Sequence, residues 1–223
     1  VPGALTSLGE AGRLRISGKV IAITGSVGKT STKEMLKTAL SSQVKTHASE
    51  RSYNNHWGVP LTLANTPLET QIAILEIGMN HPGEILPLAL IARPDVAVIT
   101  NVAIAHLAAF GSLARIAKEK ATILSSLKEE GVGIISGDCE SLKKAVETID
   151  SQIITFGKSK TVDWRLSEIR NAYSCTLCHV TAKQHDFYFR LDVIGEHYAM
   201  NAVAALCAVA EVGGDISKAI IAL

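Results

Sequence analysis

The sequence predicts an α/β fold, in which a mostly parallel sheet flanked by helices carries a small appended antiparallel sheet. Short apolar segments alternate with helical segments up to about residue 150, and these apolar segments show no polar alternation. Beyond that point, several short strands follow one another. Strands that are apolar on both faces are typical of a parallel sheet covered by helices, and a run of consecutive strands joined by polar turns is typical of an antiparallel one.

The elements of the parallel part follow from their apolar patterns and end signals. Met35, Leu36 and Ala39 have helical spacing, Pro82-Gly83-Glu84 opens a second helix, and Arg93-Pro94 ends it. The expected strands are 20–24, 44–47, 72–77, 96–100 and 132–136, and the expected helices are 30–40, 82–91 and 113–127.

In the second part, a hairpin with a polar centre precedes two helices. Gly213-Gly214 ends the first of these helices, and Asp215 is placed to cap the second. The expected strands are 153–156, 164–169, 174–180 and 187–193, and the expected helices are 198–212 and a last one from 216. Because no repeat, low-complexity tract or linker interrupts the sequence, residues 1–223 are expected to form one domain.

The composition excludes several classes of protein. With 47% apolar and 19% charged residues, the chain of 223 residues is no disordered protein. A net charge of +1 and 4% aromatic residues argue against nucleic-acid binding, and no apolar run is long enough for membrane insertion. The cysteines are expected to be reduced thiols of a cytoplasmic protein, and the single Cys175-x-x-Cys178 pair is weak support for a zinc site.

A glycine-containing turn lies where the first expected strand meets the first expected helix. Such a turn directs backbone N–H groups and a helix N-terminus towards phosphate, while a lysine reaches the terminal phosphates and a threonine binds Mg²⁺. The match is to the shortened form G-x-x-G-K-T of the phosphate loop, because Ile23 stands where the longer pattern has glycine. The candidate nucleotide-binding residues are Gly25, Ser26, Val27, Gly28, Lys29, Thr30 and Ser31.

Three further residue types are candidates for chemistry. Glu76 interrupts an apolar strand near its end, so it is either a Mg²⁺ ligand beside the phosphates or a buried carboxylate paired with an arginine. His81 and His106 follow strands on the same side of the sheet, although a lone histidine is more often structural. Lys118 and Lys120 flank a glutamate on a helix, a pattern that is also typical of a solvated face.

The motifs resemble the central ATPase domain of the Mur ligases, most closely the MurF type. The resemblance covers nearly the whole chain, in the right order. It rests on ITGSVGKTSTKEML at 23–36, YNNHWGVPLTL at 53–63, LEIGMNHPGEI at 75–85, TNVAIAHLAAFGSLARIAKEKATIL at 100–124 and IGEHYAMNAVAALCAVA at 194–210. It implies ATP and two Mg²⁺ ions as cofactors.

The resemblance also implies roles for single residues. The catalytic residues would be Lys29, His106 and a carbamylated Lys120, and the metal ligands would be Thr30, Glu76, His106 and the Lys120 carbamate. Asn201 would contact adenine, with His197 preceding it. The residues near the ATP and acceptor sites would be Asn54, Asn55, Asn80 and His81. Tyr198 departs from the family pattern, which has asparagine there.

The implied activity is the ATP-dependent addition of D-Ala-D-Ala to UDP-MurNAc-tripeptide, through an acyl phosphate, in the peptidoglycan synthesis of the bacterial cytoplasm. Residues 1–18 would lead in from an N-terminal domain, a C-terminal domain would follow, and the 223 residues alone would ligate poorly. The alternatives are a MurE-type ligase, a folylpolyglutamate synthase, a cyanophycin synthetase, a signalling NTPase and a non-catalytic nucleotide-binding module.

Overall fold

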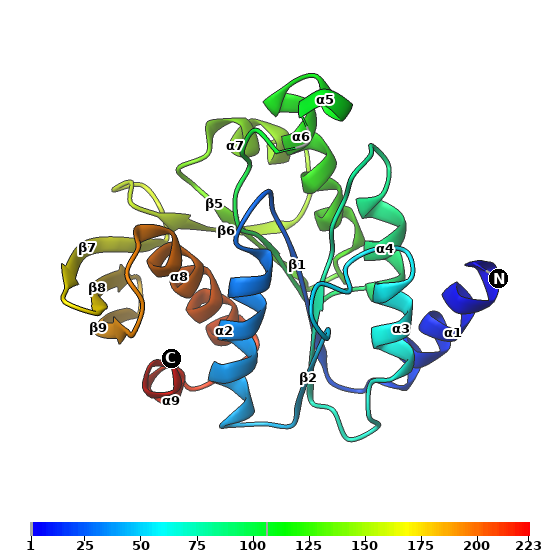
Figure 1. Ribbon diagram of the computed structural model, residues 1–223, viewed down its shortest axis with the longest axis horizontal. Coiled ribbons are helices and arrows are strands. Elements are labelled where there is room, and N and C mark those ends of the chain that lie inside the picture. Colours follow the sequence, from blue (N-terminus) through cyan, green and yellow to red (C-terminus); the bar gives the residue numbers. More distant parts are fainter. Residues whose placement is uncertain (1, 106) are drawn as a thin grey trace.

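One nine-stranded sheet, in the order β2-β3-β1-β4-β5-β6-β7-β8-β9, runs through the computed structural model, which describes residues 2–105 and 107–223 (Figure 1). Neighbouring strands from β2 to β7 are parallel, and β7, β8 and β9 are antiparallel. The strands are β1 (Lys19–Thr24), β2 (Thr46–Ala48), β3 (Ile72–Glu76), β4 (Val96–Ile99), β5 (Val132–Ser136), β6 (Gln152–Gly157), β7 (Trp164–Ala172), β8 (Cys175–Ala182) and β9 (His185–Leu191).

Helices lie on both faces of the parallel part (Figure 1). They are α1 (Pro2–Arg15), α2 (Lys29–Ser41), α3 (Gly58–Ala64), α4 (Ile85–Ala92), α5 (Leu107–Phe110), α6 (Leu113–Ala121), the 3₁₀ helix η1 (Thr122–Ser126), α7 (Glu140–Val146), α8 (Glu196–Glu211) and α9 (Ile216–Ala222).

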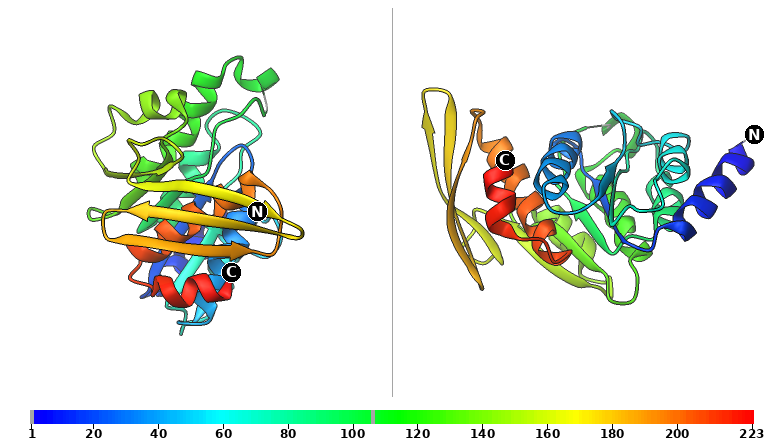
Figure 2. Two further views of the ribbon diagram at one scale, coloured as in Figure 1. Left: turned by 90° about the vertical axis from the view of Figure 1, so that its left-hand side faces the viewer. Right: turned by 90° about the horizontal axis from the view of Figure 1, so that it is seen from below.

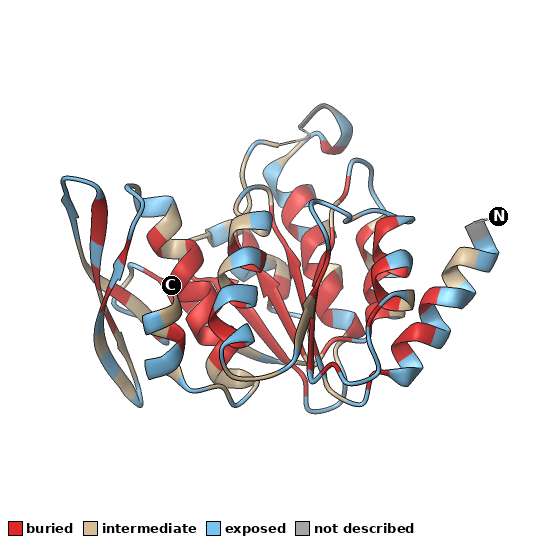
Figure 3. Ribbon diagram, turned by 60° about the horizontal axis from the view of Figure 1, so that its bottom comes forward, coloured by how far each residue is buried: buried red, intermediate tan, exposed pale blue. Residues whose placement is uncertain are grey.

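Two apolar cores form because successive side chains of each strand point to opposite faces of the sheet. Ile21 and Ile23 of β1 belong to the core under α2, α8 and α9, whereas Val20 and Ala22 belong to the core under α3, α4, α6 and α7. The central strands are therefore buried on both faces (Figure 3). This confirms the predicted parallel sheet between layers of helices.

The antiparallel strands continue the same sheet. β6 and β7 pair in parallel through Phe156 and Trp164, and the hairpin strands β8 and β9 follow outward from β7. They form one end of the molecule, and α1 lies at the other end (Figure 2). The predicted antiparallel part is confirmed. It is not a separate sheet, because β7 is hydrogen-bonded to β6 of the parallel part.

Several helices differ from those predicted. The short helices α3, α5 and α7 were not predicted, and the expected helix 113–127 ends at Ala121, where η1 begins. α3 has weak helical propensity because it starts at a glycine and contains Pro60. Its first turn is held by the side-chain oxygen of Asn55, Oδ1, which accepts hydrogen bonds from the N–H groups of Trp57 and Gly58.

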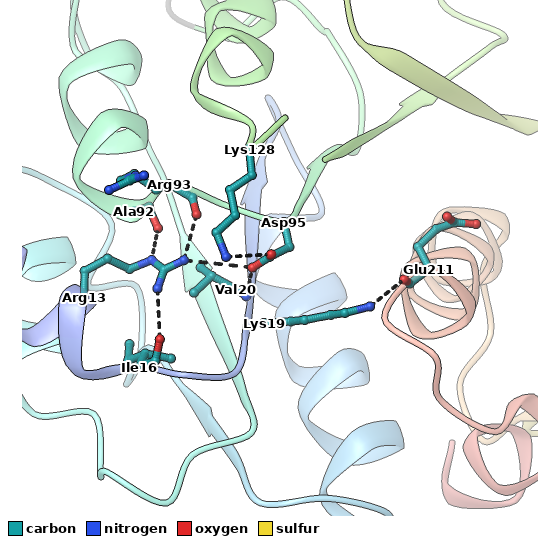
Figure 4. A network of polar contacts seen from close by, with 9 residues as sticks. All are labelled: Arg13, Ile16, Lys19, Val20, Ala92, Arg93, Asp95, Lys128 and Glu211. Carbon is teal, nitrogen blue, oxygen red and sulfur yellow. Dashed lines mark hydrogen bonds and ion pairs between the residues drawn. The ribbon is translucent and has the colours of Figure 1, made fainter. Parts of the chain in front are cut away.

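Helix α1, in the segment expected to lead into the domain, packs against α3 and α4. Arg13 near its end is only 7% exposed. Its guanidinium donates to the carbonyl oxygens of Ala92 (2.6 Å) and Arg93 (3.0 Å), where α4 ends, and to that of Ile16 (Figure 4). The side chain thus satisfies helix-end carbonyls that have no partner within the helix.

Asp95 connects this anchor to the sheet (Figure 4). Its carboxylate lies 3.9 Å from the Arg13 guanidinium and 2.7 Å from the Lys128 ammonium, and it accepts a 2.7 Å hydrogen bond from the N–H of Val20 in β1. The network lies at the amino ends of the strands, opposite the candidate site.

In the described part of the chain, every helix is too short or too polar to cross a membrane.

Candidate functional site

The phosphate-loop motif follows β1 directly and leads into α2, as predicted. Gly28 precedes α2 with φ +85°, and a Cβ on it would lie 2.4 Å from the side-chain oxygen of Asn201 in α8. A Cβ on Gly25 would lie 1.9 Å from the Thr100 hydroxyl. Only glycine fits these two positions, so the loop can run close to its neighbours with its backbone exposed to a ligand.

Thr100 and Asn101, at the end of β4, hold this loop in place. The N–H of Ser26 donates to the Asn101 carbonyl (3.1 Å), the N–H of Val27 to the Asn101 side chain (3.0 Å), and the Thr100 hydroxyl to the Val27 carbonyl (2.6 Å). Neither residue was predicted from the sequence to contact the loop. Their signal was a pair of polar residues directly after an apolar strand, at the carboxyl edge where ligands of parallel sheets bind.

Lys29 is the first residue of α2, and its ammonium donates a 2.8 Å hydrogen bond to the Gly25 carbonyl. Burial lowers the pKa of Lys29, and the nearby Glu76 carboxylate acts in the opposite direction. The cation is therefore held inside its own loop, where it is available to a phosphate group.

Glu76 ends β3 beside Ile23 of β1 and is only 1% exposed. One carboxylate oxygen accepts a 2.9 Å hydrogen bond from the Thr30 hydroxyl, and the other accepts 2.8 Å from the Asn54 side-chain amide. Among the described residues, no arginine pairs with this carboxylate. The predicted arginine pairing is therefore not the arrangement found, and the carboxylate and hydroxyl are hard oxygen donors of the kind that Mg²⁺ prefers.

The two lysines of α6 have opposite environments. Lys118 is exposed, whereas Lys120 is 2% exposed and has no hydrogen-bond acceptor among the described residues. Burial, reinforced by the charge of Lys29, lowers the pKa of Lys120 to about 7. Glu119 is partly buried, and its carboxylate accepts hydrogen bonds from the N–H groups of Gly83 and Ile85 at the start of α4.

Other predicted residues are placed less centrally. Asn201 lies against the phosphate loop, and His197 is exposed with its ring tilted on Tyr198. Asn55 caps α3. The side chains of Asn80 and His81 are exposed, while their backbone N–H groups donate to the Glu84 carboxylate. His106 lies outside the described residues.

The geometry thus brings together a phosphate loop, the Glu76 carboxylate held between Thr30 and Asn54, and a buried lysine whose pKa is lowered. The sequence model of the Mur ligase middle domain matches residues 23–209. The chain belongs to the Mur ligase family.

This Mur ligase middle domain is similar to curated UDP-N-acetylmuramoyl-tripeptide–D-alanyl-D-alanine ligases. It is 39% identical to that of Bacillus subtilis over 210 residues, which are 94% of this chain and 45% of the relative. It is 35% identical to that of Escherichia coli over 215 residues, which are 92% of this chain and 46% of the relative. The Mur ligase chain therefore spans about half the length of these relatives.

Solved MurF structures share its fold. A crystal structure of MurF from Acinetobacter baumannii superposes with a TM-score of 0.94 at 33% identity, over 100% of this chain and 49% of the other. MurF from Thermotoga maritima in complex with ADP gives a TM-score of 0.89 at 31% identity, over 98% of this chain and 52% of the other. The fold of this Mur ligase domain is thus that of the middle part of MurF.

Proposed function

We propose that this chain is the ATP-binding middle domain of a MurF-type ligase, which adds D-Ala-D-Ala to UDP-MurNAc-tripeptide in the bacterial cytoplasm. The observation that carries the proposal is the Glu76 carboxylate, held between Thr30 of the phosphate-loop helix and Asn54. The names of the similar ligases and the ADP complex of one of them support it.

The residues of this site fit a Mg²⁺–nucleotide. Backbone N–H groups of residues 25–31 and the Lys29 ammonium would bind the phosphates, and Thr30 and Glu76 would hold the metal ion. Mg²⁺ would neutralise phosphate charge and orient the phosphate oxygens. Asn201 lies against Gly28, which supports a role near the nucleotide, while its predicted contact with adenine remains a proposal.

The reaction we propose has two steps. The terminal carboxylate of the tripeptide attacks the γ-phosphorus of ATP, so that an acyl phosphate forms and ADP leaves. The amine of D-Ala-D-Ala then attacks the acyl carbon, and phosphate leaves with the bond electrons while the amine loses a proton. Because carboxylate and triphosphate repel each other, Lys29 contributes by compensating charge at the transferred group.

A carbamate on Lys120 is part of the proposal. An amine whose pKa is about 7 is about half unprotonated at neutral pH, and the neutral form reacts with CO₂, which converts a cation into an anion. With His106, this carbamate would form the second metal site. The parts of the relatives that this chain does not span, an N-terminal and a C-terminal domain, would supply the remaining substrate contacts.

The test is ATP-dependent phosphate release by the full-length protein, either with UDP-MurNAc-tripeptide and D-Ala-D-Ala or with UDP-MurNAc-L-Ala-D-Glu and diaminopimelate. We expect stimulation by D-Ala-D-Ala and its loss in Lys29→Ala and Glu76→Ala, with Lys118→Ala retaining activity. Stimulation by another acceptor would favour a sister ligase. Nucleotide binding without any phosphate release would indicate a non-catalytic binding module.

A further inference from the structure

Lys33 is a buried charged residue that the proposed chemistry does not use. It lies on α2, and its side chain is 0% exposed. Its ammonium donates to the carbonyl oxygens of Ser49 (2.8 Å) and Arg51 and lies 2.9 Å from the carboxylate of Glu34. Burying an ammonium group costs free energy unless the group is paired, so the folded chain must keep these acceptors in place around Lys33.

The acceptors of Lys33 belong to the segment that follows β2. Ser49 is bound to β3 by its N–H, which donates to the Ile74 carbonyl at 2.9 Å, and by its hydroxyl, which accepts from the N–H of Glu76 at 3.2 Å. Arg51 has a left-handed backbone with φ +47°, an unfavourable conformation for a residue with a side chain. Lys33 therefore stabilises a bend that turns the chain towards Asn54.

That bend determines the position of Asn54, the second residue that holds the Glu76 carboxylate. The Glu76 carboxylate is held on one side by Thr30 of α2 and on the other by Asn54 of the loop. Lys33 lies three residues after Thr30, about one helical turn along α2, and connects this helix to the loop. The helix that carries Thr30 and the loop that carries Asn54 are thus connected by the side chain of Lys33.

We propose that Lys33 is a positioning residue that fixes the orientation of the Glu76 carboxylate for a Mg²⁺–nucleotide. This inference rests on the proposed function, because it presumes that Glu76 binds the metal ion. Residues that orient metal ligands through hydrogen bonds commonly change metal affinity by about 10- to 100-fold when they are replaced. Lys33 would act through two links, namely Ser49 at the backbone of Glu76 and the bend that leads to Asn54.

The experiment compares ADP affinities of the full-length protein by calorimetry in Mg²⁺ and in EDTA. Lys33→Met keeps the side-chain length and removes the ammonium. We expect the gain in ADP affinity that Mg²⁺ provides to fall by about tenfold or more, while affinity in EDTA stays within about twofold. Mn²⁺ binding in the presence of ADP, followed by electron paramagnetic resonance, should weaken in parallel. Lys37→Met, at an exposed position one turn further along α2, is the matched control.

A purely structural role predicts another outcome. If Lys33→Met lowers the melting temperature but leaves the Mg²⁺-dependent gain unchanged, the inference is overturned. If that variant does not fold, Ser49→Ala decides, because it removes the hydroxyl that accepts from the Glu76 N–H. We expect a smaller loss in the same quantity, and an unchanged gain overturns the inference. A wild-type protein without any Mg²⁺-dependent gain would instead refute the proposed function.

Discussion

The Thr30 hydroxyl donates a 2.9 Å hydrogen bond to the Glu76 carboxylate, although 46 residues separate the two along the chain. Thr30 lies in the first turn of α2, and Glu76 is the last residue of β3. The parallel pairing of β1 with β3 brings these two ends together, because Ile23 lies opposite Glu76 just before the phosphate loop. The proposed metal site is therefore located by both side chains together, one from the helix and one from the strand.

Removing the Thr30 hydroxyl should weaken binding of the Mg²⁺–nucleotide. Thr30→Val keeps the branched side chain but removes both the hydrogen bond to Glu76 and a metal donor. We expect ADP affinity in Mg²⁺ to fall by about tenfold or more, with little change in EDTA, measured by calorimetry. Thr30→Ser retains the hydroxyl and should stay close to wild type. Wild-type affinity of the valine variant in Mg²⁺ would contradict the assignment.

Lys120 should take up CO₂ in a pH-dependent way. Carbamate formation needs the neutral amine, and with a pKa of about 7 the neutral fraction falls about tenfold for each pH unit below that value. We expect a carbamate signal in ¹³C NMR spectra of the full-length protein in ¹³C-bicarbonate at pH 8, and its loss towards pH 6. The signal should persist in Lys118→Met and vanish in Lys120→Met; its persistence in the latter would locate the carbamate elsewhere.

The same lysine should make stability depend on pH. Its folded-state pKa of about 7 lies below the ordinary value of 10.5, so between these values the unfolded state binds more protons and the free energy of unfolding rises with pH. In CO₂-free buffer, Lys120→Met should therefore gain stability relative to wild type at pH 7, by about 2–4 kcal/mol more than at pH 10. Urea unfolding at both pH values measures this, and a pH-independent difference would speak against a depressed pKa.

Gly28 should tolerate alanine less well than a glycine with the same backbone in open space. Gly213 has φ +84° with nothing within 4 Å, so Gly213→Ala should cost about 1 kcal/mol from backbone strain alone. Gly28→Ala adds a clash with Asn201 and should cost about 2 kcal/mol or more, measured by thermal unfolding. Asn201→Ala in the Gly28→Ala background should recover part of the loss, and equal costs at the two glycines would contradict the close contact.

Arg13 should contribute strongly to stability. Arg13→Met leaves the carbonyl oxygens of Ala92 and Arg93 without their charged donor, and we expect a loss of about 2–3 kcal/mol in the free energy of unfolding. Arg15→Met is the control, because Arg15 is exposed and, among the described residues, bonded to the Ala64 carbonyl alone; we expect a change within about 0.5 kcal/mol. Urea titration compares the two, and similar losses would mean that the buried network contributes little.

Much of the fold could be predicted because strand periodicity and turn signals are local properties. The apolar run around Ile23 and the glycines after it predict β1 and the phosphate loop without reference to the rest of the chain. α3 could not be predicted, since its start depends on Asn55 and its glycine and proline disfavour a helix. The candidate site shows the same division, because Lys29 and Glu76 were predicted from local motifs, whereas the contacts of Thr100 and Asn101 with the phosphate loop were not.

The sequence by itself determined the strands, the helices α2, α4, α6, α8 and α9, the phosphate-loop motif and the family resemblance, because these depend on residue type and spacing. The tertiary structure alone decided which lysine of α6 is buried, what Glu76 pairs with and how Lys33 joins helix to loop. Those properties depend on contacts between residues far apart in the chain. Burial and hydrogen bonding, which shift a pKa or orient a carboxylate, exist only once the sheet has brought these residues together.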